Sequence, residues 1–312
     1  MKIRFLLCLL LSITSLWAQE KNPLLADPTI FEHEGTYYLY GTKGNTDIKG
    51  EGFLVYTSTN LKDWKGPVGA TDGFAFKKGD GYGTWGFWAP QIFEHNNKFY
   101  MAYTADEHIA IATADSPLGP FKNEGKALPS DVRQIDPFVF FDSGKIYLYH
   151  VRLEKGNRIF VAEMENDLSA IKPATLKECI TATEHWEDTE KVEWTVTEGP
   201  TVLKKDNLYY LIYSANDFRN KDYAVGYATS TTPYGPWRKS ADSPFISRDL
   251  LKYPGTGHGD IFYDKKGNMF YVFHTHNSES EVAPRKTAIV PVSLKKGVIQ
   301  IPKGKKLVWV SL

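Results

Sequence analysis

Short segments of alternating hydrophobic and polar residues, separated by turn sequences, run along most of this chain. Segments such as TYYLYGT (36–42) and IYLYHVR (146–152) point successive side chains to opposite faces, as half-buried β-strands do. The turns HEGT, HNNK, DSGK, KDNL and DKKGN carry Gly or Asn, which tolerate the positive φ angles of tight hairpins. No convincing amphipathic helix lies between these segments. The pattern predicts an all-β protein.

One hairpin sequence recurs five times along the chain, which is a stronger signal than any single strand. Each copy has a small or polar pair, three strand-type residues, a turn and an aromatic-rich strand. The copies begin at Asp27, Ala89, Asp136, Gly199 and His258, so that successive starts lie 62, 47, 63 and 59 residues apart. They read DPTIFEHEGTYYLYGT, APQIFEHNNKFYMAYTA, DPFVFFDSGKIYLYHVR, GPTVLKKDNLYYLIYSA and HGDIFYDKKGNMFYVFHTH.

A further strand sequence follows each hairpin, and a turn-rich run follows that strand. These strand sequences are GFLVYTS, HIAIATA, RIFVAEM, YAVGYAT and KTAIVPV. Each unit therefore contains three or four short antiparallel strands, the content of a propeller blade. A β-sandwich also has many short strands, but not one hairpin repeated at this period. We expect a five-bladed β-propeller, each blade a short antiparallel sheet.

The first residues are predicted to be a signal peptide rather than part of the fold. Lys2 and Arg4 precede an apolar run from Phe5 to Trp17, and Ala18 offers a cleavage point. The run is too short to span a bilayer comfortably, and no other stretch approaches its length. We therefore expect a signal peptide at 1–18, one propeller domain at 19–312, no membrane insertion, and export to the periplasm or the extracellular space.

Charge and cysteine content narrow the class of protein. Without residues 1–18 the chain keeps 35 basic and 37 acidic side chains, a net charge of −2, which does not suggest a nucleic-acid partner. Only Cys179 of the two cysteines remains, so that an intrachain disulfide is excluded. Stability must come from one large buried core. The aromatic content of 14% suits strands and also suits the stacking of sugar rings.

Acidic residues recur at the starts of the repeats. In a propeller these starts line the central axis, so residues far apart in sequence meet there. The positions hold Asp27, Ala89, Asp136, Gly199 with Glu198 before it, and His258. Asp-Pro can be a simple turn device. Three carboxylates in one small volume repel one another, however, and such clusters are typical of functional sites.

Five motifs in this order identify the family that the chain resembles. They are ADPTIF with GTYYLYGT, WAPQIF with KFYMAYTA, IDPFVF, TEGPTVL with LYYLIYSA, and the GHGDIF hairpin. The chain resembles glycoside hydrolase family 43 over essentially all of residues 23–295. That resemblance implies a catalytic five-bladed propeller.

The resemblance also implies an inverting hydrolysis by three carboxylates. Inversion needs an acid that protonates the departing oxygen and a base that activates water on the opposite face of the sugar, about 6.5–9.5 Å apart. By motif position, Asp27 is the expected general base and Glu198 the general acid. Asp136 is expected to raise the pKa of Glu198 and to orient it, because a neighbouring negative charge favours the protonated form.

Further candidate site residues accompany the trio, and the same likeness implies two of them, His258 and Arg285. His258 matches a central histidine that is associated with calcium or a water cluster on the axis, although a lone histidine is usually a core group. Arg285 matches an arginine that reaches the sugar; otherwise it would be a surface charge. Trp85 and Trp88 are expected to form an aromatic wall, unless they are core residues, and Gln91 to contact substrate or support His258. No cofactor is required, and calcium would be structural, with mostly water ligands.

The expected substrate is a plant-type oligo- or polysaccharide. We expect an exo-acting α-L-arabinofuranosidase or β-xylosidase. An endo-arabinanase or exo-galactanase shares the same trio, and a non-catalytic carbohydrate-binding propeller is the non-enzymatic alternative. A retaining propeller hydrolase of the invertase type would carry Asn-Asp-Pro-Asn, whereas Asp27 here lies between Ala26 and Pro28-Thr29. The intact trio favours an enzyme over a binding protein.

Overall fold

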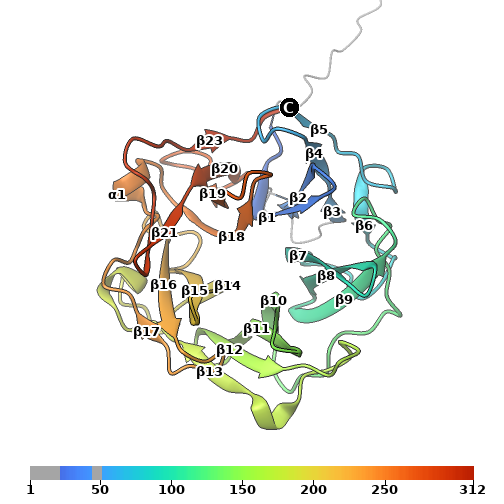
Figure 1. Ribbon diagram of the computed structural model, residues 1–312, viewed down its shortest axis with the longest axis horizontal. Coiled ribbons are helices and arrows are strands. Elements are labelled where there is room, and N and C mark those ends of the chain that lie inside the picture. Colours follow the sequence, from blue (N-terminus) through green and yellow to red (C-terminus); the bar gives the residue numbers. More distant parts are fainter. Residues whose placement is uncertain (1–21, 44–50) are drawn as a thin grey trace, which may run out of the picture.

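The computed structural model describes residues 22–43 and 51–312, and within them five small antiparallel sheets form a closed ring around a central axis (Figure 1). The first strand of each sheet lies innermost. The five-bladed β-propeller predicted from the repeats is confirmed. The predicted signal peptide at 1–18 lies outside the described residues.

The blades follow one another along the chain. The first blade contains β1 (Leu25–His33), β2 (Thr36–Lys43), β4 (Tyr56–Ser58) and β5 (Trp64–Lys65), and the second contains β7 (Trp88–His95), β8 (Lys98–Ala105) and β9 (His108–Ala114). The third blade contains β10 (Gln134–Asp142), β11 (Lys145–Leu153), β12 (Asn157–Glu163) and β13 (Lys177–Ile180), and the fourth contains β14 (Thr197–Lys205), β15 (Leu208–Ala215), β16 (Ala224–Ser230) and β17 (Arg238–Lys239). The fifth blade contains β18 (Gly257–Tyr263), β19 (Met269–Thr275), β20 (Lys286–Pro291) and β23 (Val308–Trp309).

Shorter elements connect and decorate these blades. They are β3 (Gly52–Leu54) paired with β6 (Phe74–Lys77), β21 (Ser293–Lys295) paired with β22 (Val298–Gln300), the four-residue helix α1 (Arg248–Leu251), and two 3₁₀ turns at Pro173–Thr175 and His185–Glu187. In the described part of the chain, no helix has the length and apolar character needed to cross a membrane.

The tight turns between first and second strands are built as their sequences predict. In the first four blades the two turn residues both have positive φ: 48° and 77° at Glu34 and Gly35, and 50° and 61° at Asn96 and Asn97. This is the type I′ geometry, whose twist matches that of the flanking strands. The third and fourth turns, at 143–144 and 206–207, follow the same pattern.

The sequence GFLVYTS departs from its prediction as a single third strand. It divides at Val55 into β3, which pairs with β6 outside the blade, and β4, which pairs with β2 inside it. Alternation along the sequence detects strand conformation but does not distinguish which neighbour each half pairs with.

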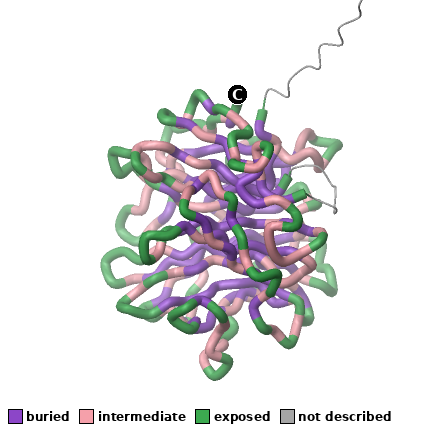
Figure 2. The backbone as a smooth tube through the Cα atoms, turned by 90° about the vertical axis from the view of Figure 1, so that its right-hand side faces the viewer, coloured by how far each residue is buried: buried purple, intermediate pink, exposed green. Residues whose placement is uncertain are grey.

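In the part of the chain that the structure describes, the hydrophobic core consists of five clusters, one between each pair of adjacent blades. Tyr40 and Met101 belong to the cluster between the first and second blades, and Leu148 and Ala102 to the next. The others join blades three and four, four and five, and five and one. Figure 2 shows the buried strands forming the interior and the exposed residues concentrated at the turns. Each blade therefore buries its two faces against its neighbours.

Within the described residues, where Cys179 is a free cysteine, the ring closes between the first and last blades without a disulfide. The Leu25 N–H donates to Thr287 Oγ1 (3.2 Å), and the Thr287 hydroxyl lies 2.8 Å from the Leu25 carbonyl oxygen. Leu25, Val272 and Ile289 share one hydrophobic cluster across this junction. Closure fixes all five innermost strands, and with them the residues at the centre.

Candidate active site

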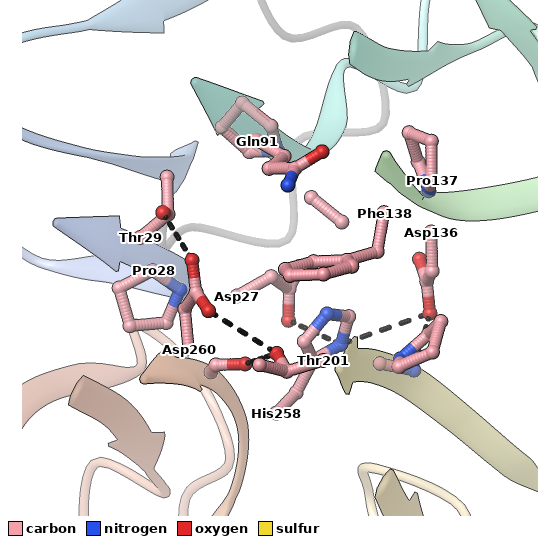
Figure 3. Close-up of a pocket in the computed structure, with 15 residues that line it drawn as sticks. Asp27, Pro28, Thr29, Gln91, Asp136, Pro137, Phe138, Thr201, His258 and Asp260 are labelled. Atoms are coloured by element: carbon pink, nitrogen blue, oxygen red, sulfur yellow. Dashed lines mark hydrogen bonds and ion pairs between the residues drawn. The ribbon is translucent and has the colours of Figure 1, made fainter. Parts of the chain in front are cut away.

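A bulge opens each innermost strand at the position where the repeat begins. Between Ala26 and Thr29, and at the corresponding place in the other four blades, the register with the second strand shifts. The five residues at these starts all have positive φ: Asp27 46°, Ala89 44°, Asp136 55°, Gly199 60° and His258 38°. A bulge re-aims a side chain at the cost of local strain. Here it brings Asp27, Asp136 and His258 to one cavity at the axis (Figure 3).

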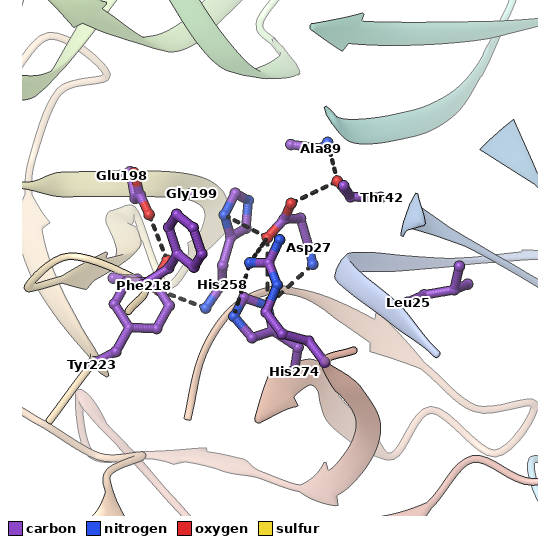
Figure 4. Close-up of polar contacts among 12 residues, drawn as sticks. Leu25, Asp27, Thr42, Ala89, Glu198, Gly199, Phe218, Tyr223, His258 and His274 are labelled. Carbon is purple, nitrogen blue, oxygen red and sulfur yellow. Dashed lines mark hydrogen bonds and ion pairs between the residues drawn. The ribbon is translucent and has the colours of Figure 1, made fainter. Parts of the chain in front are cut away.

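Asp27 is buried among positive and neutral hydrogen-bonding groups (Figure 4). The Thr42 hydroxyl donates to its Oδ2 at 2.6 Å, and the Arg285 guanidinium lies 3.3 Å from its Oδ1. The ring nitrogens Nδ1 of His258 and His274 each lie 3.4 Å from the same Oδ1. Burial alone raises the pKa of Asp27, but the Arg285 charge, any positive charge on the two histidines and the Thr42 hydrogen bond outweigh it and hold the pKa below its usual range. Asp27 is therefore ionised at neutral pH.

The two histidines beside Asp27 are neutral. Burial is the main cause that lowers the pKa of both rings, although the Asp27 charge opposes it. The Asp27 N–H donates to His274 Nδ1 at 3.1 Å, which requires that nitrogen to be an unprotonated acceptor. Arg285 is thus the cation that faces Asp27, and the Phe218 ring lies 4.7 Å from its guanidinium carbon.

A row of side-chain acceptors explains how the blade starts are held together. The Ala89 N–H donates to the Thr42 hydroxyl at 3.0 Å, the Asp136 N–H to the Thr104 hydroxyl at 2.9 Å, and the His258 N–H to the Ser214 hydroxyl at 2.8 Å. Each acceptor lies at the end of the second strand of the preceding blade. His274 plays the same part for Asp27.

The third blade has Val151 at this position, which offers no acceptor. The Gly199 N–H donates to Asp136 Oδ2 instead, at 3.1 Å. Because Val151 cannot accept this hydrogen bond, Asp136 accepts it and is thereby bonded to the residue that follows Glu198.

Asp136 is buried beside other carboxylates. Burial, followed by the charges of Glu198 and Asp27, raises the pKa of Asp136 well above its usual value, against the opposing hydrogen bond from Gly199. Its environment is therefore the opposite of that around Asp27, although both residues begin a blade with Asp-Pro.

Glu198 lies at the start of β14 and is held by two donors. The Tyr223 hydroxyl donates to its Oε1 at 2.8 Å, and the Asn157 amide nitrogen donates to its Oε2 at 3.0 Å. Burial raises the pKa of Glu198 to about 7; the charges of Asp217 and Asp27 also raise it, while Tyr223 and Asn157 oppose the change. At neutral pH a large share of Glu198 therefore carries a proton, as a general acid requires.

A second ring of side chains lies two residues further along each innermost strand: Thr29, Gln91, Phe138, Thr201 and Asp260. With the blade starts it lines an axial cavity of about 30 Å³, which has room for water but not for a sugar. Asp260 accepts hydrogen bonds from Thr29 at 2.7 Å and Thr201 at 3.2 Å. Burial raises the pKa of Asp260 to about 6.

The two ends of the Gln91 amide are both used by the main chain of Val139. Its nitrogen donates to the Val139 carbonyl oxygen at 3.0 Å, and its oxygen accepts from the Val139 N–H at 2.6 Å. The side chain lines the cavity but joins the second and third blades rather than supporting His258.

Trp85 and Trp88 pack against each other at the start of the second blade, with ring centroids 5.7 Å apart in an edge-to-face arrangement. Both are partly exposed. The Asp106 carboxylate accepts the Trp85 N–H at 2.9 Å, and the Trp85 carbonyl oxygen accepts the Asp106 N–H at 2.9 Å. These bonds hold the segment that carries Trp85, while Trp88 directly precedes Ala89. Neither ring lines the axial cavity, so both lie outside its narrow part.

A sequence profile of glycosyl hydrolases family 43 matches residues 21–299. The chain belongs to this family.

The chain is also similar to solved structures. An endo-1,4-β-xylanase from Bacteroides thetaiotaomicron is 43% identical, with a TM-score of 0.85, and the match covers 93% of this chain and 97% of that one. A thermostable family-43 glycoside hydrolase is 34% identical, with a TM-score of 0.80, over 90% and 94% of the two chains.

Among curated proteins, a xylosidase/arabinosidase of Butyrivibrio fibrisolvens is 31% identical over 60% of this chain and 37% of its own length. An extracellular exo-α-(1→5)-L-arabinofuranosidase of Streptomyces avermitilis is 24% identical over 82% and 56%. The chain thus spans only about a third to just over half of these curated relatives.

The His and Asp side chains at the axis do not by themselves form a metal site. Within residues 22–43 and 51–312, no three His, Cys, Asp or Glu side chains are grouped so that they could hold a metal ion. A calcium ion beside His258 would take most of its oxygen ligands from water. The calcium site therefore stays a prediction, and no catalytic step is assigned to a metal.

Several site residues were not found from the sequence. Thr42 and His274 contact Asp27, and Tyr223 and Asn157 hold Glu198. The available signal was repeat position: Thr42, Thr104, Ser214 and His274 all lie at the end of a second strand, next to the following blade's start. Tyr223 and Asn157 have no such signal, because they come from outside the repeated hairpin.

Proposed function

We propose that this chain is an inverting glycoside hydrolase that releases pentose units from plant-type polysaccharides. The observation that carries the proposal is the contrast between two buried carboxylates at one axis. Arg285 keeps Asp27 ionised, whereas burial keeps a large share of Glu198 protonated at neutral pH. A base and an acid with separated pKa values are what an inverting mechanism needs.

In the proposed reaction, Asp27 accepts a proton from water as the water oxygen bonds to the anomeric carbon. Glu198 gives its proton to the glycosidic oxygen as the bond from that oxygen to the anomeric carbon breaks. The products are the sugar with inverted configuration and the free hydroxyl of the leaving group. The Asp136 carboxylate accepts the N–H of Gly199, the residue after Glu198. Because Asp136 and Glu198 are neighbouring acids, a negative charge on one raises the pKa of the other.

We expect an exo-acting α-L-arabinofuranosidase or β-xylosidase. Support comes from two relatives, one named as a xylosidase/arabinosidase and the other as an exo-α-(1→5)-L-arabinofuranosidase. An endo-acting enzyme is the second candidate, because the 43% identical structure is described as an endo-1,4-β-xylanase. Export to the periplasm or extracellular space fits the signal-like residues 1–18 and the extracellular relatives.

Chromatography of digests of arabinan, arabinoxylan, xylan and galactan tests the proposal. An exo enzyme yields only monosaccharide from the earliest time points, whereas an endo enzyme first yields a ladder of oligosaccharides. A non-catalytic binding propeller releases nothing from these polymers or from aryl arabinofuranoside and xyloside, and that result would refute the proposed activity.

Replacement of Asp136 by asparagine is expected to slow the reaction and to move the alkaline limb of kcat/KM to lower pH. In the wild type, the second proton of the Asp136–Glu198 pair leaves against a negative charge that is already present. In D136N that charge is absent, so Glu198 ionises at lower pH. Profiles from about pH 5 to about pH 9 measure the shift. An unchanged alkaline limb would assign Asp136 a purely structural role.

A further inference from the structure

Asn157 links the proposed acid to an aromatic side chain at the surface. Its amide nitrogen donates to Glu198 Oε2 at 3.0 Å, while its amide oxygen accepts the Trp194 Nε1–H at 2.9 Å. An indole nitrogen can only donate, so it requires the oxygen end of the amide. Trp194 thereby fixes which end of Asn157 faces Glu198.

The rest of the Trp194 ring is open to solvent. The residue is 48% exposed, and Val192, two positions earlier, is 45% exposed. Tryptophan is usually well covered in a folded protein. An exposed indole two hydrogen bonds from a buried acid is thus an apolar surface at the edge of the site.

The loop that carries Trp194 is firmly anchored. The fully buried Glu187 carboxylate accepts the N–H groups of Thr183 (2.6 Å) and Glu184 (2.8 Å) and forms an ion pair with Lys239 (2.5 Å). Downstream of Trp194, the Asn157 N–H donates to the Thr195 carbonyl oxygen at 2.8 Å. A surface held in this way needs little ordering when a ligand binds, which favours affinity.

We propose that Trp194 is the platform for the leaving-group sugar, and that its N–H, through Asn157, also orients Glu198 toward the bond that breaks. This inference rests on the proposed function. A general acid must lie within hydrogen-bond distance of the glycosidic oxygen, so the sugar on the departing side lies next to Glu198. The apolar face of a sugar ring stacks on an indole, and Trp194 presents such a face beside the acid.

Three variants and two substrates distinguish the role of Trp194 as a sugar platform from its role in orienting Glu198. The substrates are an oligosaccharide that the wild type cleaves and the glycosyl fluoride of the same terminal sugar, whose leaving group has no ring and needs little protonation. W194A loses both the platform and the N–H, W194F keeps an aromatic face but loses the N–H, and N157A loses only the amide.

For the oligosaccharide, we expect W194A to raise KM about 3- to 10-fold, the range of an aromatic contact, and also to lower kcat. We expect W194F and N157A to lower kcat about 10-fold, with KM within about 2-fold of wild type. All three variants should hydrolyse the fluoride within about 3-fold of the wild-type rate, because neither stacking nor strong acid assistance is needed there.

Tyr263→Ala is the matched control, because Tyr263 is an equally exposed aromatic (50%) at the far end of β18. It should change neither kcat nor KM.

An unchanged oligosaccharide KM in W194A, or an equal rise in KM for the fluoride, would overturn the platform role. Unchanged kcat in both W194F and N157A would overturn the orienting role. If W194A does not fold, W194F and N157A still test that role. A wild type that cleaves no pentose oligosaccharide and no pentosyl fluoride would instead refute the proposed function.

Discussion

Replacement of Asp27 by asparagine is expected to remove nearly all activity, by about 10²–10⁴-fold or more in kcat/KM. The variant keeps the shape of the side chain but has no basic oxygen with which to deprotonate water. The attacking water needs that base whichever group departs. The loss should therefore be comparable on an oligosaccharide and on a nitrophenyl glycoside, and kcat/KM on both substrates measures it.

Asp142→Asn is the matched control for this experiment. Asp142 lies at the other end of an innermost strand, at the β10–β11 turn, and binds Lys204 and Tyr209 rather than the axial cavity. The control should keep close to wild-type activity, and thermal unfolding should show both variants folded. Near-wild-type turnover by D27N would mean that another group is the base.

The Glu198→Gln variant is expected to depend strongly on the leaving group. A sugar alkoxide is a poor leaving group and needs protonation as the bond breaks, whereas nitrophenolate leaves readily without it. The loss should reach about 10²–10⁴-fold on an oligosaccharide and be at least about 10-fold smaller on the aryl glycoside. Glutamine keeps the shape of the side chain and can still accept from Tyr223, although its amide nitrogen cannot accept from Asn157 as the carboxylate oxygen does.

Comparing the two substrates in E198Q and D27N side by side separates acid from base. Equal losses on both substrates in E198Q would place the proton donor elsewhere. The alkaline limb of the wild-type profile provides a second check, because activity that needs protonated Glu198 should decline as pH rises through about 7.

The fold was predictable because its signals are local and repeated. Turn pairs such as Asn96-Asn97 favour the left-handed angles that type I′ hairpins need, and alternating strands on either side fix which face is buried. Five copies of one hairpin then leave few architectures other than a propeller. Repeat position likewise predicted that Asp27, Asp136 and His258 meet at the axis, and they do.

The local geometry of the site was less predictable. A residue before proline is biased toward extended conformations, yet Asp27 and Asp136 both have positive φ before Pro28 and Pro137. Tertiary packing overrides that bias. The different pKa directions of the two aspartates also depend on distant residues: Arg285 faces Asp27, while Glu198 faces Asp136.

The anomeric configuration of the first product tests the central claim most directly. Proton NMR of the reaction, recorded from the first minutes in a deuterated buffer, follows both anomers before they equilibrate. If Asp27 activates water while Glu198 protonates the leaving group, the anomer opposite to that of the substrate appears first. First appearance of the retained anomer would show a covalent intermediate, and would contradict the assignment of Asp27 and Glu198 as base and acid.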